Sequence, residues 1–235
     1  MSVNEKVKYR LKFTKSGNVR FIGHLDLMSL FNMAIKRADV PIAYSEGFNP
    51  HQIISFALPL SLGYYSKGEY VDISLNTPIS CKTMVGSLNK SMPDGLKILA
   101  AKKLDISEKS GASLVSACAY RVCFPSTVQV PTETAADFIK QDNIVIEKKT
   151  KKNTALTDIA SDIFSFNPKI TNGLVEEIEI CISAGPNRSI RADSVMKALF
   201  DFANKPYPEY ELRYIREEMY RVGENGFSPL IGGSI

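Results

Sequence analysis

Two histidines, His24 and His51, are the only imidazoles in the chain, and each lies where one predicted element gives way to another. An imidazole titrates near neutral pH, so it can act as a general base or bind a phosphate. Asp26 lies in the first turn of a predicted helix, close enough in sequence to orient His24. The structural alternative is that His24 makes local hydrogen bonds and Asp26 compensates the positive end of the helix dipole. His24 and Asp26 are therefore the candidate catalytic residues.

A second candidate site is the loop Ser45–His51, which is rich in turn-forming residues. Gly47 permits a positive φ, and Pro50 stiffens the backbone. Phe48 and His51 could stack on a nucleic-acid base from such a loop. Alternatively, Phe48 anchors the loop in the hydrophobic core. The residues of this half of the chain that we predict to bind nucleic acid are Arg20, Tyr44, Phe48, Asn49 and His51, and Glu46 is a further site candidate.

Two acidic residues, Glu69 and Asp72, lie at the start of a strand predicted at residues 70–75, Glu69 immediately before it and Asp72 within it. We expect both carboxylates on one face of that strand, where they could meet His24 and Asp26 at the end of the sheet. The alternative is that they are ordinary residues of a solvent-facing strand surface.

The segment Gly185–Arg191 leads directly into a predicted helix and carries Arg188 and Arg191. Exposed amides, two guanidinium groups and a helix N-terminus together favour a phosphate site. A capped loop explains the same residues, and the segment contains no P-loop or G-x-G-x-x-G pattern.

The four cysteines are scattered, without a C-x-x-C pair or a nearby histidine, so neither a zinc site nor an iron–sulfur cluster is expected. We predict no metal and no cofactor. The net charge of +4 and pI near 8.7 permit binding to a polyanion without requiring it.

Hydrophobic periodicity predicts an α+β protein with two ferredoxin-like halves. In the first half, residues 7–13 alternate apolar and basic side chains, which predicts a strand with one apolar and one basic face. The order strand, helix, strand, strand, helix, strand then follows from residues 24–38, 53–60, 70–75, the helix opened by Pro78, and residues 96–101.

The remainder repeats that order with weaker signals. We expect a domain at residues 1–107 that carries the motifs and a second at residues 113–235. The segments on which the second domain depends are strands at 114–124, 174–182 and 210–222, helices at 132–141 and 192–204, a partly alternating stretch at 144–149 and an ambiguous one at 159–166.

Three stretches together resemble the radical SAM-linked protein family. They are Arg20-Phe21-Ile22-Gly23-His24-Leu25-Asp26-Leu27-Met28, Ala43-Tyr44-Ser45-Glu46-Gly47-Phe48-Asn49-Pro50-His51 and Gly68-Glu69-Tyr70-Val71-Asp72, supported by the two shorter stretches Ile54-Ser55-Phe56-Ala57 and Pro59-Leu60-Ser61-Leu62-Gly63, and the resemblance spans residues 7–75. That family is a domain of uncharacterised function, found alone or joined to a radical SAM protein, so the resemblance implies a radical SAM partner. The chain departs from the family at Gln52-Ile53, where a proline and a basic residue are usual, and it lacks the C-x-x-x-C-x-x-C cluster motif.

Paired ferredoxin-like units with a histidine after the first strand also look like the endoribonucleases of the RAMP superfamily. That likeness implies that His24 deprotonates a 2′-hydroxyl, which needs no metal.

Three functions follow as alternatives. The first is an RNA-binding accessory protein that presents tRNA or rRNA to a radical SAM modification enzyme. The second is a metal-independent ribonuclease that uses His24, and the third is a protein-binding subunit without nucleic-acid contact. No signal-peptide core and no run of about 20 apolar residues is present, so we expect a cytoplasmic protein without a membrane segment.

Overall fold

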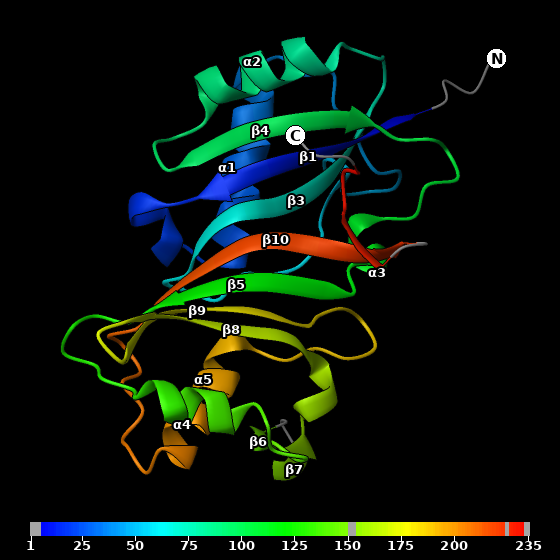
Figure 1. The fold of residues 1–235 in the computed structure, drawn as a ribbon. Helices are drawn as coiled ribbons and strands as arrows, with labels where there is room; N and C mark the ends of the chain where they lie inside the picture. Colours follow the sequence, from blue (N-terminus) through cyan, green and yellow to red (C-terminus); the bar gives the residue numbers. More distant parts are fainter. Residues whose placement is uncertain (1–5, 150–153, 224–225, 233–235) are drawn as a thin grey trace. The chain divides into compact units, whose positions relative to one another are not determined.

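The computed structural model describes residues 6–149, 154–223 and 226–232 (Figure 1). The chain divides into two compact units. Unit 1 contains Met1–Ser116 and Glu218–Ile235, and unit 2 contains Ala117–Glu217. Helices and antiparallel strands occur in both, which confirms the α+β class. No helix within the described ranges is long and apolar enough to cross a membrane. The C-terminal segment Glu218–Ile235 belongs to unit 1, so the first unit is not continuous in sequence.

Unit 1 has the predicted order of elements, β-α-β-β-α-β, followed by a short helix. Its sheet runs in the order β4-β1-β3, with β2 paired to β3, and these pairs are antiparallel. The elements are β1 (Val7–Lys15), a 3-10 turn (Gly17–Phe21), α1 (His24–Arg37), β2 (Ile54–Phe56), β3 (Tyr65–Leu75), α2 (Cys81–Ser91), β4 (Leu96–Lys103) and α3 (Gly111–Leu114), joined by the second part of β10 (Arg213–Gly223) and by β11 (Gly226–Pro229).

The core of unit 1 lies between this sheet and its two long helices. Tyr9, Leu11 and Phe13 of β1 are buried with Phe31 of α1 and Leu88 of α2. Because successive side chains of a strand point to opposite faces, the alternating apolar residues of β1 all lie on the face that packs against the helices. The other face of β1 carries basic side chains, as predicted, but it is not a solvent surface throughout.

Arg10, on that second face, has no exposed surface (0 %) and anchors a buried polar network. Its Nε and Nη2 donate to the two carboxylate oxygens of Asp72 at 2.7 and 3.0 Å. Its remaining N–H groups reach the carbonyl oxygens of Lys109 at 2.9 Å and Leu230 at 3.1 Å. Asp72 also accepts from the backbone N–H of Gly111 at 2.7 Å. One guanidinium group therefore connects β1, β3, the start of α3 and the C-terminal segment.

A second polar group lies on the same face. Tyr70 donates its hydroxyl to Oε1 of Glu218 at 2.7 Å, and the ammonium of Lys12 donates to Oε2 at 2.7 Å. Burial of the ring, together with the charge of Glu218 and its hydrogen bond, raises the pKa of Tyr70 far above the usual value of 10.0.

This shift predicts a loss of stability in alkali. A phenol whose pKa is higher in the folded chain than in the unfolded one ionises first in the unfolded chain. The ionisation of Tyr70 therefore does not affect the free energy of unfolding below about pH 10, and it lowers that free energy as the pH rises further. We expect the free energy of unfolding to decrease above about pH 10, and Tyr70→Phe to make this decrease shallower. Urea unfolding followed by circular dichroism at several alkaline pH values measures both slopes, and equal slopes would contradict the prediction.

Unit 2 has a sheet in the order β10-β5-β9-β8, to which β10 contributes the part that belongs to this unit. The hairpin β6–β7 forms a separate two-stranded sheet that the sequence did not predict. Without that hairpin the order of elements again becomes β-α-β-β-α-β, while the ferredoxin-like description of the halves stays a prediction. The elements are β5 (Ala117–Cys123), α4 (Thr132–Phe138), β6 (Val145–Lys149), β7 (Thr154–Asp158), a 3-10 turn (Ala160–Asp162), β8 (Ile163–Thr171), β9 (Leu174–Ser183) and α5 (Ala192–Phe202).

Candidate nucleic-acid interface

His24 is the first residue of α1, and packing of its ring fixes its position. The ring meets Phe56 of β2 edge-on, with 5.3 Å between centroids. Phe56 in turn contacts Phe13 at 6.0 Å and Phe31 at 5.2 Å, so the imidazole lies at the border of the aromatic core. His24 is half-buried, and within the described part of the chain its nitrogens have no hydrogen-bonding partner. The imidazole is therefore positioned by its contact with Phe56.

The carboxylates predicted near His24 have different surroundings. Asp26 is exposed in the first turn of α1, and its carboxylate points back towards Gly23, the residue before the helix. This position fits the alternative role of Asp26, in which its negative charge compensates the positive end of the helix dipole. Asp72 pairs with Arg10, on the face of β3 opposite to α1. Glu69 is buried, at 3 % exposure, and lies opposite Phe13 in the β1–β3 register. The expectation that both acids share one face was wrong, because residues three apart in a strand point to opposite faces.

The loop Ser45–His51 is closed at its base by three hydrogen bonds. The N–H of Ser45 donates to the carbonyl of His51 at 2.8 Å, and the N–H of His51 donates to Ser45 Oγ at 3.1 Å. Ser45 Oγ is also 2.9 Å from His51 Nδ1, which fixes the orientation of the imidazole. Tyr44 and Gln52 continue the pairing as a β-bridge, and Gly47 adopts a φ of 110° within the turn.

Phe48 lies between these closed ends and is fully exposed, at 111 % of its reference surface. The alternative that it anchors the loop in the core is therefore excluded. Asn49 and Glu46 are also exposed, and Glu46 is 3.9 Å from the ammonium of Lys6. A loop whose base is hydrogen-bonded presents one large apolar ring to solvent.

The two imidazoles lie at different positions along α1. His24 contacts Phe56, whereas Gln52, next to His51, donates to the carbonyl of Asn32 at 3.2 Å. Eight residues separate His24 from Asn32, which is about 12 Å along a helix at 1.5 Å per residue. The segment 52–56 thus runs alongside α1, with His51 towards its middle and His24 at its start.

Arg20 lies beside the start of α1 and uses its flat face for aromatic contacts. Its guanidinium carbon is 4.1 Å from the ring centroid of Phe21 and 4.8 Å from that of Tyr65. Its Nη1 donates to the carbonyl of Gly17 at 3.0 Å. The guanidinium is therefore held in place between two rings while N–H groups at its edge remain for a further acceptor.

The two arginines predicted to bind phosphate in unit 2 are already paired with carboxylates. Arg188 donates through Nε to Asp162 at 2.5 Å and through Nη2 to the carbonyl of Asp158 at 2.9 Å. Arg191 donates through Nε to Asp193 at 2.9 Å. These contacts give both side chains a structural role at the start of α5 and reduce their attraction for a phosphate.

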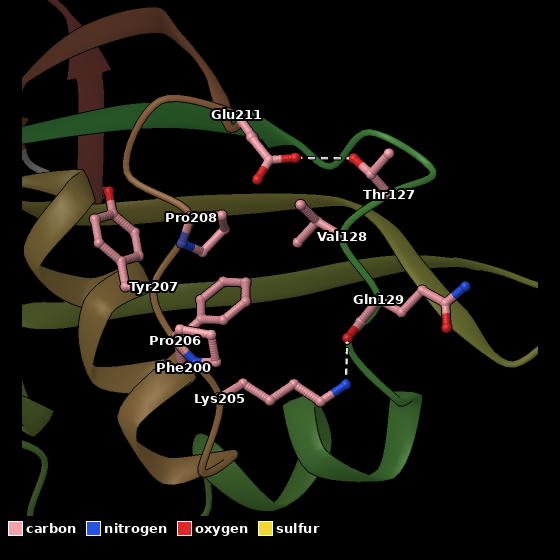
Figure 2. Close-up of a pocket in the computed structure, with 9 residues that line it drawn as sticks. All are labelled: Thr127, Val128, Gln129, Phe200, Lys205, Pro206, Tyr207, Pro208 and Glu211. Carbon is pink, nitrogen blue, oxygen red and sulfur yellow. Dashed lines mark hydrogen bonds between the residues drawn. The ribbon is translucent and has the colours of Figure 1, made fainter.

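Sequence reasoning missed a hollow in unit 2, lined by loop residues after β5 and by the segment that follows α5 (Figure 2). The closely spaced Pro206 and Pro208 on either side of Tyr207 were the available signal, because prolines fix the backbone of a surface segment. Within the described ranges, no group of three or more His, Cys, Asp or Glu side chains is arranged to hold a metal ion.

Comparison with known proteins places the chain beside proteins whose function is also uncharacterised. A family model described as "Uncharacterized protein conserved in bacteria (DUF2344)" matches residues 8–192. No sequence among curated proteins matches the chain. Among solved structures, the "Crystal Structure of an Unknown Protein from Galdieria sulphuraria" is 12% identical and covers 91% of this chain and 98% of its own, with a TM-score of 0.26.

Proposed function

The chain belongs to the family of uncharacterised proteins conserved in bacteria (DUF2344), and from the arrangement of unit 1 we propose that it is an RNA-binding accessory protein. The observation that carries this proposal is the fully exposed ring of Phe48 on a loop with a hydrogen-bonded base. An aromatic side chain in this position offers a stacking platform to an unpaired base, worth about 1–3 kcal/mol per base.

The surroundings of the loop supply positive charge. Lys6 approaches the carbonyl of Tyr44 at 3.5 Å, and Lys8 of β1 is exposed. Lys36 is also exposed and lies one helical turn after Asn32, on the side of α1 that Gln52 contacts. These ammonium groups fit a phosphate backbone that passes the loop while a base stacks on Phe48.

Single-stranded RNA is the form that this arrangement favours. A base must leave a helical stack before its face can meet an aromatic side chain, and loops and bulges of structured RNA provide such bases. The resemblance to the radical SAM-linked family adds the partner. In this proposal the protein holds tRNA or rRNA by an unpaired segment and presents it to a radical SAM enzyme.

The proposal predicts salt-dependent binding. A fluorescent single-stranded RNA should bind more tightly than a duplex of the same length in an anisotropy titration, and log K should fall linearly with log salt by about 0.7 per phosphate neutralised. Lys36→Gln should lower the slope by about that amount. Lys90→Gln, an exposed lysine in the last turn of α2, is the matched control.

The outcomes separate the three functions. Absence of binding at low salt would reject RNA as the ligand and leave the protein-binding subunit. Cleavage of the bound RNA that disappears in His24→Ala, with affinity unchanged, would select the ribonuclease. Co-purification from cells tests the radical SAM partner separately.

A further inference from the structure

The hollow in unit 2 has a volume of ≈ 490 Å³, which is within the range of small-molecule sites. One wall is formed by Thr127, Val128 and Gln129, which follow β5. The other is the segment after α5, and Phe200 of that helix lies between the two (Figure 2). The full lining is Thr127–Gln129, Phe200, Lys205–Pro208 and Glu211.

Hydrogen bonds join the two walls at both ends. The ammonium of Lys205 donates to the carbonyl of Gln129 at 2.7 Å, and the hydroxyl of Thr127 donates to Oε2 of Glu211 at 2.9 Å (Figure 2). Tyr207 is fixed by a hydrogen bond of 2.9 Å between its hydroxyl and that of Tyr214. The site is therefore formed before any ligand arrives, which lowers the entropic cost of binding.

Aromatic packing makes the floor rigid. Phe200 lies parallel to Phe124, with 6.2 Å between centroids, and meets Tyr207 edge-on at 6.0 Å. Pro206 and Pro208 lack N–H donors and have fixed φ angles. Between the two charged ends, the surface is thus apolar and suits a flat ring.

The charged ends differ in sign. Lys205 uses one of its three N–H donors on Gln129, which leaves donors for an anion. Glu211 uses Oε2 for Thr127 and has Oε1 left to accept from a ligand donor. Figure 2 shows these two side chains at opposite ends, with Val128, Pro208 and Phe200 between them.

We propose that this site binds a nucleoside monophosphate whose base carries an exocyclic amino group. The phosphate meets Lys205, the base lies on Val128 and the two prolines, which are partly exposed, above the buried ring of Phe200, and the amino group donates to Glu211. The identity of the ligand rests on the proposed RNA function, whereas the shape and charges of the site do not depend on that proposal. A free nucleotide and the terminal nucleotide of an RNA share this chemistry.

Cytidine and uridine monophosphates provide the decisive pair, because they differ at the position where cytosine has an amino group and uracil a carbonyl oxygen. In calorimetric titrations of the full chain, CMP should bind about tenfold more tightly than UMP, since a hydrogen bond to a charged acceptor is lost with UMP. CMP should also bind more tightly than cytidine or inorganic phosphate alone. A 5′-phosphorylated RNA that begins with cytidine, titrated beside CMP, distinguishes a terminal nucleotide from a free one.

Two variants assign the ends of the site. Glu211→Gln should reduce the preference for CMP over UMP to about twofold, because an amide can both donate and accept. Lys205→Met should bring the affinity for CMP down to that for cytidine. The control is Lys197→Met, because Lys197 is an exposed lysine of α5 that does not line the site.

Equal binding of CMP and UMP, or no binding of either at millimolar concentration, would overturn the nucleotide assignment. Circular dichroism of each variant checks that unit 2 remains folded. Failure here is distinguishable from failure of the RNA proposal, because salt-dependent RNA binding and its sensitivity to Phe48 are read in unit 1. If the protein binds RNA but does not bind CMP, only the proposed nucleotide site in unit 2 is rejected.

Discussion

Arg10→Ala is expected to lower the free energy of unfolding of unit 1 by about 3–5 kcal/mol, because it leaves the Asp72 carboxylate without its countercharge. The side chains of Arg10 and Asp72 are 0% and 13% exposed, so water replaces little of what is lost. The carbonyls of Lys109 and Leu230 lose their donor at the same time. Urea unfolding followed by circular dichroism measures the change.

Lys8→Ala is the matched control, because Lys8 is a basic residue of the same strand whose side chain is exposed. It should change stability by no more than about 0.5 kcal/mol. The double variant Arg10→Met with Asp72→Leu should recover part of the loss, since no unpaired charge is then buried. An unchanged midpoint in Arg10→Ala would show that the network contributes no stability.

Phe48→Ala is expected to weaken binding of single-stranded RNA by about 1–3 kcal/mol, which is about fivefold to 150-fold, without loss of fold. The ring is fully exposed, so its removal costs no packing. Phe48→Leu keeps an apolar side chain but removes the ring, and it should lose almost as much affinity. Anisotropy titration at constant salt measures both.

Ile106→Ala controls for the removal of any exposed apolar side chain from unit 1, because Ile106 is also largely exposed. It should leave the affinity unchanged. If Phe48→Leu binds as tightly as the unchanged protein, Phe48 acts by hydrophobic contact and not by stacking. If Phe48→Ala binds equally well, RNA does not use this loop.

Local periodicity predicted unit 1 well and unit 2 less completely. The alternation of Val7 to Phe13 identified β1 and its buried face, because a period of two leaves one interpretation for a half-buried strand. Unit 2 contains the hairpin β6–β7 and the strand β8, whose mixed polar sequences lack a clear period. β6 pairs with β7 and β8 with β9, in each case the next strand in the chain, so the missing signal was the alternation of side chains and not the distance between partners.

The candidate site could be predicted in its parts but not in its arrangement. The turn residues of Ser45–His51 identified the loop, and the exposure of Phe48 required the structure, since an isolated aromatic fits a core and a surface equally well. The burial of Arg10 could not be predicted, because its alternation with apolar residues indicates a face and not what covers that face. The same applies to Asp72, which pairs with Arg10 instead of meeting His24.

The hydrogen bond between Arg10 and the carbonyl of Leu230 joins residues from nearly opposite ends of the sequence. During translation Arg10 leaves the ribosome long before Leu230, so the nascent chain must carry an incomplete first unit while the whole of Ala117–Glu217 is synthesised. The second unit is continuous in sequence and can acquire its structure in that interval, since domains generally fold as they emerge. Nascent chains arrested before and after Leu230 should therefore differ in the protease resistance of the first unit and agree in that of the second.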